Sequence, residues 1–254
     1  MLSLAGGFIA DSHRAWPTLL HNAFFFMAIG LGALFFMAIQ YAAEVGWSAA
    51  VKRPMEAIAS FLPYGAGIFG LVVIMSALHV NHIYHWADPA VTTEGSPEYD
   101  RILDGKSAFL NPVFFIIRTV VYLAGWVLFY RAFMIRSEIE RQAYDVKSWK
   151  KSQSLAAYFL VFFAVTSSTA SWDWIMSIDA HWFSTLFGWY TFAGFFVSAL
   201  TVITLVVLHL KSKGLLPEVN DNHIHDLGKF MFAFSVFWTY LWFSQFMLIW
   251  YSNI

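Results

Sequence analysis

The chain has 254 residues, of which 59% are hydrophobic and only 12% are charged. Soluble domains carry roughly 25% charged residues, so this composition excludes an ordinary globular protein and predicts an integral membrane protein. The net charge of −1 and the lack of a basic run argue against a nucleic-acid partner. The sequence has no cysteine, which excludes disulfides, cysteine-held iron–sulfur clusters and C-x-x-C-H haem attachment on this chain.

Six apolar stretches are each long enough to cross a membrane as a helix, which needs about 20 residues. They cover residues 18–43, 57–78, 113–135, 154–171, 183–208 and 230–251. These stretches are too long and continuous for strands of a membrane barrel, so we predict an all-α polytopic transmembrane helix bundle. Residues 1–254 are expected to form a single integral membrane domain. No signal peptide is expected, because the start lacks a basic region and a cleavage pattern.

Lysine and arginine in the connections predict the orientation of the bundle. The connections after the first, third and fifth stretches hold eleven of them: Lys52, Arg53, Arg131, Arg136, Arg141, Lys147, Lys150, Lys151, Lys211, Lys213 and Lys229. The opposite side holds three, Arg14, Arg101 and Lys106. Because cytoplasmic connections are enriched in these residues, we expect a multi-pass protein of the bacterial inner membrane with both ends in the periplasm.

Ionisable residues gather at the predicted outer ends of the helices. They are His13 and His21 at the start of the first stretch, His79, His82 and His85 in HVNHIYHW, Arg118 in the third stretch, and Asp173, Asp179 and His181 in SWDWIMSIDAHW. If the second helix persists, three-residue steps keep its imidazoles within an arc of about 120°. A single histidine here is more often an interfacial anchor, but ionisable groups inside a span usually pair or line a pathway.

Such a cluster suits proton transfer to or from a quinol. Histidine titrates near neutral pH, and quinol oxidation needs a base near each hydroxyl and a short proton path to water. A dihaem site is disfavoured, because His79 and His82 share one helix end. His223 and His225 are too few to predict a metal site.

Polar residues at two other places also need an interpretation. Ser168 and Thr169, below Asp173, are either helix-packing hydroxyls or a proton relay. On the inner side, Asp226 is predicted to be the N-cap of the last helix.

Two long segments resemble a known family. SWDWIMSIDAHWFSTLFGWYTFAGFF (171–196) and HIHDLGKFMFAFSVFWTYLWFSQFMLIWYSNI (223–254) are similar to the quinone-binding membrane subunits of bacterial alternative complex III, a quinol:cytochrome c oxidoreductase of the NrfD or polysulfide-reductase type. HNAFFFMAIGLGALFFMAIQYAAEVGWS (21–48) and HVNHIYHW resemble the second of these subunits, lettered F. The resemblance implies a larger bundle, so we expect segments beyond both ends of this chain, whose last span runs almost to its final residue.

The resemblance also implies partners and substrate. The partners would be membrane lipid, a sister subunit of the same type, an iron–sulfur protein, and multihaem and monohaem cytochrome c subunits. The substrate would be menaquinol or ubiquinol, with electrons leaving through the other subunits, since no haem or iron–sulfur cluster is expected on this chain. The chain would thus be a subunit of an oxidoreductase and not an enzyme alone.

Three functions compete. In the first, the chain binds or flanks quinol, with His79, His82, Asp173, Asp179 and His181 as proton carriers, Arg118 as counter-charge, and His85 and Trp172 as pocket wall. In the second, it is a proton-translocating or scaffold subunit without a quinone site, with entry through Glu44 and Glu56 past Gln40, and Ser168 and Thr169 further along. The third, an ion-coupled transporter, is least favoured, because the polar residues gather at one surface and no internal repeat occurs.

Overall fold

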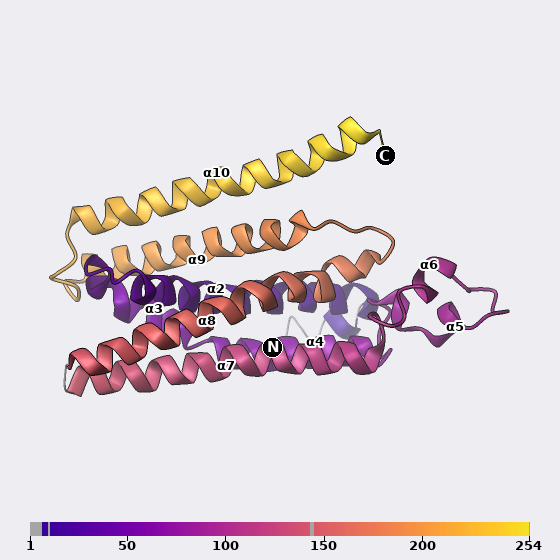
Figure 1. The fold of residues 1–254 in the computed structure, drawn as a ribbon, viewed down its shortest axis with the longest axis horizontal. Coiled ribbons are helices and arrows are strands. Elements are labelled where there is room, and N and C mark those ends of the chain that lie inside the picture. Colours follow the sequence, from indigo (N-terminus) through magenta and orange to yellow (C-terminus); the bar gives the residue numbers. More distant parts are fainter. Residues whose placement is uncertain (1–6, 10, 143–144, 254) are drawn as a thin grey trace.

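Six long helices run back and forth through the computed structural model (Figure 1). The structure describes residues 7–9, 11–142 and 145–253, and no strand occurs among them. The bundle comprises α2 (Ser12–Ala42), a second span made of η1 (Trp47–Val51), α3 (Lys52–Ala59) and α4 (Leu62–Ala77), then α7 (Pro112–Gln142), α8 (Val146–Trp174), α9 (Leu186–Ser212) and α10 (Asp221–Ser252). All six spans are long and apolar enough to cross a membrane, which confirms the predicted all-α polytopic bundle.

The two ends of the bundle differ in structure. At one, which we call the cap end, lie the short helices η2 (His85–Ala87), α5 (Pro89–Thr92), α6 (Arg101–Asp104) and η3 (Met176–Asp179). Figure 1 shows α5 and α6 projecting beyond the long helices. The opposite end, which we call the basic end, holds the turn between α2 and η1 and the connections from α7 to α8 and from α9 to α10.

The helices extend beyond the apolar stretches that predicted them. The helix α8 begins at Val146 rather than at residue 154, and α10 begins at Asp221 rather than at residue 230. A helix of 31 residues such as α2 is about 46 Å long, whereas the hydrocarbon core of a bilayer is about 30 Å thick. The extra turns carry polar residues because they extend past the apolar layer.

The second span ends before its histidines, so the condition under which they would share one face of a helix is not met. The helix α4 ends at Ala77, and His79 adopts a left-handed conformation with φ 59°. The backbone N–H of Val80 donates to the carbonyl of Met75, and that of His79 donates to the carbonyl of Ser76. This is the Schellman pattern, which satisfies the last carbonyls of a helix and stops it.

The asparagine that follows holds the chain after this stop. The Asn81 side chain donates to Ser76 Oγ at 2.9 Å and accepts from the backbone N–H of Ile83 at 3.1 Å. His79, His82 and His85 therefore lie on an irregular segment rather than on one face of a helix.

The prediction that Asp226 caps the last helix is wrong. The N-cap of α10 lies six residues earlier, at Asn220, whose side chain accepts from the backbone N–H groups of Asn222 and His223. The His223 ring in turn accepts from the backbone N–H of Asn220, which completes a capping box. Asp226 lies inside the helix and pairs with Lys229 at 2.9 Å.

The helix α2 forms the centre of the bundle, because it packs against α3, α4, α8 and α9. The helix α7 packs against α4 and α8. At the outer edge, α10 packs along α9, and Leu227 and Leu241 are its buried residues (Figure 1). The core is rich in aromatic rings, such as Phe35, which stacks on Phe163 with ring centres 4.5 Å apart.

Gly32 sets the close approach of α2 to α9. A Cβ atom at Gly32 would lie 2.6 Å from the Cβ of Ala199, closer than two carbon atoms can pack. We expect Gly32→Ala to destabilise the protein by about 1–3 kcal/mol, the usual cost of overpacking a core. Gly67→Ala is the matched control, because a Cβ there meets nothing within 4 Å and alanine favours a helix. Thermal unfolding in detergent would compare them, and equal midpoints for both variants would contradict this packing.

Candidate functional site

Three imidazoles and a carboxylate lie together at the cap end. The rings of His13, from α2, and His82 stack with their centres 6.0 Å apart. The ring of His79 meets that of His82 edge-on at 5.1 Å. On its other side, His79 Nε2 lies 3.5 Å from Asp88 Oδ2, and its Nδ1 is buried without a hydrogen-bond partner among the described residues. We call these four residues the imidazole cluster.

An apolar cavity of about 320 Å³ lies beside the imidazole cluster. Most of its wall is aromatic or aliphatic and comes from α2, α4, the end of α8 and η3: Leu20, Phe24, Phe69, Trp174, Ile175 and Ile178. Its titratable lining residues are His21 and His82. Ligand sites commonly combine an apolar wall with a few placed polar groups, as this cavity does.

A second, more polar cavity of about 240 Å³ adjoins the first. Ser12, His13 and Asn81 line it, and it shares Pro17, His82 and Ile83 with the apolar cavity. His82 therefore stands at the boundary between an apolar and a polar space. An imidazole in this position can accept a proton on the apolar side and pass it to the polar side.

Arg118 and Asp173 form a buried ion pair rather than part of a cavity wall. Arg118 Nε donates to Asp173 Oδ2 at 2.8 Å, and a terminal guanidinium nitrogen donates to Oδ1 at 2.9 Å. The guanidinium also donates to the carbonyl of Phe109 at 3.1 Å and lies over the rings of Phe109 and Phe114, at 3.9 and 4.2 Å from their centres. This two-pronged pair joins α7 to α8.

Neighbouring hydrogen bonds join α7 to α8, and join α8 to the connection between α4 and α7. The indole N–H of Trp174 donates to Thr119 Oγ1, and the Tyr84 hydroxyl donates to the carbonyl of Trp174, each at 2.9 Å. Burial raises the pKa of Tyr84, and the nearby Asp173 raises it further, so this phenol stays protonated. Trp174 also lines the apolar cavity, so this network fixes one wall of it.

The remaining residues predicted for this site lie away from the imidazole cluster. His181 is exposed, and its Nε2 lies 2.6 Å from Asp100 Oδ2, at the N-cap of α6. The hydrogen bond from His181 lowers the pKa of Asp100. Asp179 is exposed, and so is His85 at the start of η2. Trp172 lines a different cavity from His82, so Trp172 and His85 do not form one pocket wall with the imidazole cluster.

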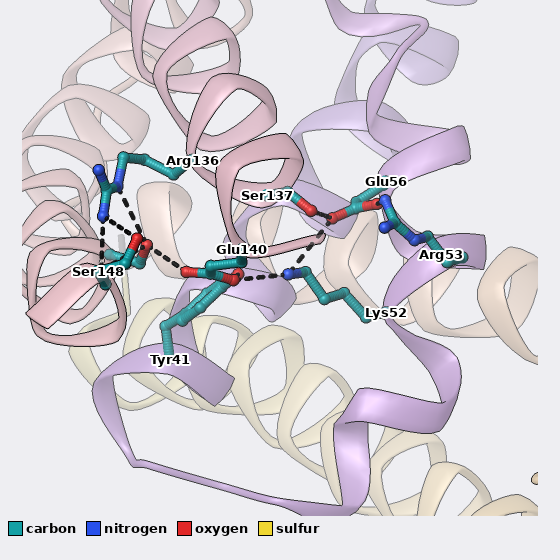
Figure 2. A network of polar contacts seen from close by, with 9 residues as sticks. Tyr41, Lys52, Arg53, Glu56, Arg136, Ser137, Glu140 and Ser148 are labelled. Atoms are coloured by element: carbon teal, nitrogen blue, oxygen red, sulfur yellow. Dashed lines mark hydrogen bonds and ion pairs between the residues drawn. The ribbon is translucent and has the colours of Figure 1, made fainter. Parts of the chain in front are cut away.

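A second polar network lies at the basic end (Figure 2). Glu140 accepts from Tyr41 at 2.8 Å, from Lys52 at 3.0 Å and from Ser152 at 2.5 Å. Lys52 also lies 3.8 Å from Glu56 Oε1, and Figure 2 shows its ammonium group between the two carboxylates.

Other side chains enclose both carboxylates of this network. Arg53 donates to Glu56 at 2.6 Å, and the hydroxyl of Ser137 donates to it as well. Arg136 donates to Ser148, which lies one turn from Ser152. The negative charges of the two glutamates are thus matched by Lys52 and Arg53.

The other residues of the predicted proton path are dispersed. Gln40 is buried, its amide oxygen has no partner among the described residues, and it lines a cavity of about 100 Å³ with Tyr41 and Lys52. Glu44 is exposed and accepts from Gln153 at 2.5 Å. Ser168 and Thr169 donate to carbonyls of their own helix, at Ala164 and Val165. These two hydroxyls are therefore satisfied locally.

The sequence interpretation missed Glu140 and Asp88. Glu140 lies in the sequence RSEIERQ, where alternating charges are typical of an exposed helix end, and its partner Tyr41 is 99 residues away. Asp88 precedes a proline, and its side chain caps α5 by accepting from the backbone N–H of Ala90. The local sequence around Glu140 and Asp88 does not indicate their contacts with Tyr41 and His79.

Fold and cavities together define a polytopic α-helical membrane protein with an imidazole-lined apolar cavity at one end. Neither a scan against protein-family models nor a search of curated proteins finds a match for this chain.

Proposed function

We propose that the chain is a membrane subunit of a respiratory quinol oxidoreductase, and that quinol binds in the apolar cavity at the cap end. One observation carries this proposal: His21 and His82 are the titratable residues on the wall of an otherwise aromatic and aliphatic cavity. A quinol has an apolar ring and tail and two hydroxyl groups that must lose protons, so it matches this lining. The resemblance to the alternative complex III subunits supports the same substrate.

The chemistry assigned to this chain is proton transfer. Oxidation of one quinol to quinone breaks two O–H bonds and releases two protons and two electrons. The electrons pass to an iron–sulfur or haem centre of a partner subunit. His82 accepts a proton from one hydroxyl, and His21 is placed to accept the other.

The proton on His82 has a route to the surface. Its ring centre lies 5.1 Å from that of His79, and His79 Nε2 lies 3.5 Å from Asp88 Oδ2. Asp88 and His79 are both partly exposed, with 28% and 31% of their side-chain surfaces accessible. If the cap end faces the periplasm, as the lysine and arginine distribution predicts, these protons are released outside.

A second candidate function, proton translocation without a quinone site, rests on the network at the basic end. Lys52 lies between two carboxylates, and the unpartnered amide oxygen of Gln40 lines the small cavity beside it. Buried ionisable groups within membrane spans often mark proton pathways. This candidate keeps the same complex but assigns the chain only a proton path or a scaffold.

The structure of the purified complex with a bound quinol analogue separates the two candidates. We expect the analogue ring beside His21 and His82, with its tail along Phe24 and Ile178. An analogue found only in another subunit would overturn the quinol site in this chain and leave the proton-path candidate.

A further inference from the structure

A third cavity at the cap end, of about 370 Å³, lies apart from the apolar cavity beside His82. Its wall is formed by the segment 105–110 before α7 and by the connection from α8 to α9. The aromatic part comprises Phe109, Trp172, Trp182 and Phe183. Phe109, Trp182 and Phe183 are also exposed, so the cavity opens to the surface of the bundle.

The polar groups of this cavity are hydrogen-bond donors. Lys106 lines it, and its ammonium group donates to the carbonyl of Ala180 at 2.5 Å and lies 6.0 Å from the ring centre of Phe183. An ammonium group has three N–H donors, so one such bond leaves two for a ligand. Trp172 also lines the cavity, and its indole N–H is buried without an acceptor among the described residues.

No carboxylate lines this cavity among the described residues. A buried donor without an acceptor is costly, and a lysine without a facing carboxylate favours an anion. The wall also contains the hydroxyl of Ser177, which already donates to the carbonyl of Asp173. The lining therefore requires a ligand that brings oxygen acceptors and negative charge.

The place of the cavity along the bundle indicates the source of such a ligand. It lies where α7 begins, at Pro112, and beside η3 (Met176–Asp179), which follows the end of α8 at Trp174. Tryptophan and lysine at the ends of membrane spans sit at the level of the lipid head groups. An apolar, aromatic wall that is open to the surface at this level is suited to an acyl chain.

We propose that this cavity is a specific site for an anionic phospholipid. The phosphate accepts hydrogen bonds from the Lys106 ammonium and the Trp172 indole, and an acyl chain lies against Phe109 and Phe183. This site is independent of the proposed quinol cavity, because the two share no lining residue.

Native mass spectrometry of the purified protein with added phosphatidylglycerol tests this site. We expect one tightly held phosphatidylglycerol, and about tenfold weaker retention in Lys106→Gln, which loses the positive charge, and in Trp172→Phe, which loses the N–H donor. Trp172→Phe keeps an aromatic ring in the wall, so its effect reports the lost N–H. Lys213→Gln, at the exposed end of α9, is the matched control and should retain the lipid.

Three results would overturn the proposal. Equal lipid retention by Lys106→Gln and Lys213→Gln would show that Lys106 holds no head group. Displacement of the lipid by millimolar inorganic phosphate, with phosphate retained in its place, would make this a phosphate site rather than a lipid site. Phosphatidylcholine, which carries no net charge, should bind more weakly than phosphatidylglycerol, and equal binding of the two would also contradict an anion site.

Discussion

Replacing Asp173 by asparagine is expected to destabilise the folded protein by about 3–5 kcal/mol, the usual result of removing one partner from a buried ion pair. Asp173 is fully buried, and the Arg118 side chain is only 9% accessible, so the guanidinium would remain in the core without a counter-charge. Chemical or thermal unfolding in detergent measures this effect.

The double variant Arg118→Met with Asp173→Leu tests the physical reason. Replacing both charges by apolar side chains of similar volume should recover most of the lost stability. Recovery should be incomplete, because the carbonyl of Phe109 loses the hydrogen bond that Arg118 donates to it.

An exposed ion pair serves as the control for this prediction. Arg141→Gln breaks the pair with Glu138. The two side chains are 62% and 44% accessible, so this variant should lose less than about 1 kcal/mol of folding stability. If Asp173→Asn were no more destabilising than Arg141→Gln, the buried pair would not be the lock between α7 and α8 that its geometry indicates.

His82→Gln is expected to lower kcat/KM for quinol oxidation by the assembled complex by at least about 100-fold. A positioned general base typically contributes 10²–10⁴-fold, and glutamine keeps hydrogen-bonding capacity without a titratable nitrogen. His82 lines both the apolar and the polar cavity, so no other residue of the imidazole cluster can replace it at that boundary. Steady-state kinetics with a soluble quinol analogue would measure the loss.

His85→Gln is the matched control, because His85 lies three residues further along the same segment, is exposed and lines none of the cavities described above. It should keep nearly full activity. Full activity in both variants would contradict a role for the imidazole cluster.

The hydropathy of the sequence predicted the six spans and their class, because a span must satisfy all of its backbone groups within a helix and cover itself with apolar side chains. It placed the end of the second span at residue 78, against Ala77 in the structure, but not the cause of that stop, which is the left-handed conformation of His79 and the hydrogen bonds of the Asn81 side chain. It missed the polar first turns of α8 and α10, because an average of hydropathy does not detect polar helical turns.

The candidate site was predicted in its composition but not in its grouping. The sequence placed the histidines, Asp173 and Arg118 at one end of the bundle as a single constellation. The structure divides them into the imidazole cluster, the buried pair of Arg118 with Asp173, and the exposed pair of His181 with Asp100. Residues at the same depth in the bundle come into contact only if the rotation of their helices and the tertiary packing bring them together. Spacing along the chain does not determine these contacts.

The peripheral position of α10 has a consequence for how the protein comes apart. Because α10 buries little of its surface, its local free energy of opening should be far below that of the other helices, and it forms a separate unit of partial unfolding. None of its residues lines the cavities at the cap end. A molecule in which α10 has detached is therefore expected to retain the cavities at the cap end, so that loss of α10 and loss of these cavities would be separate steps of unfolding.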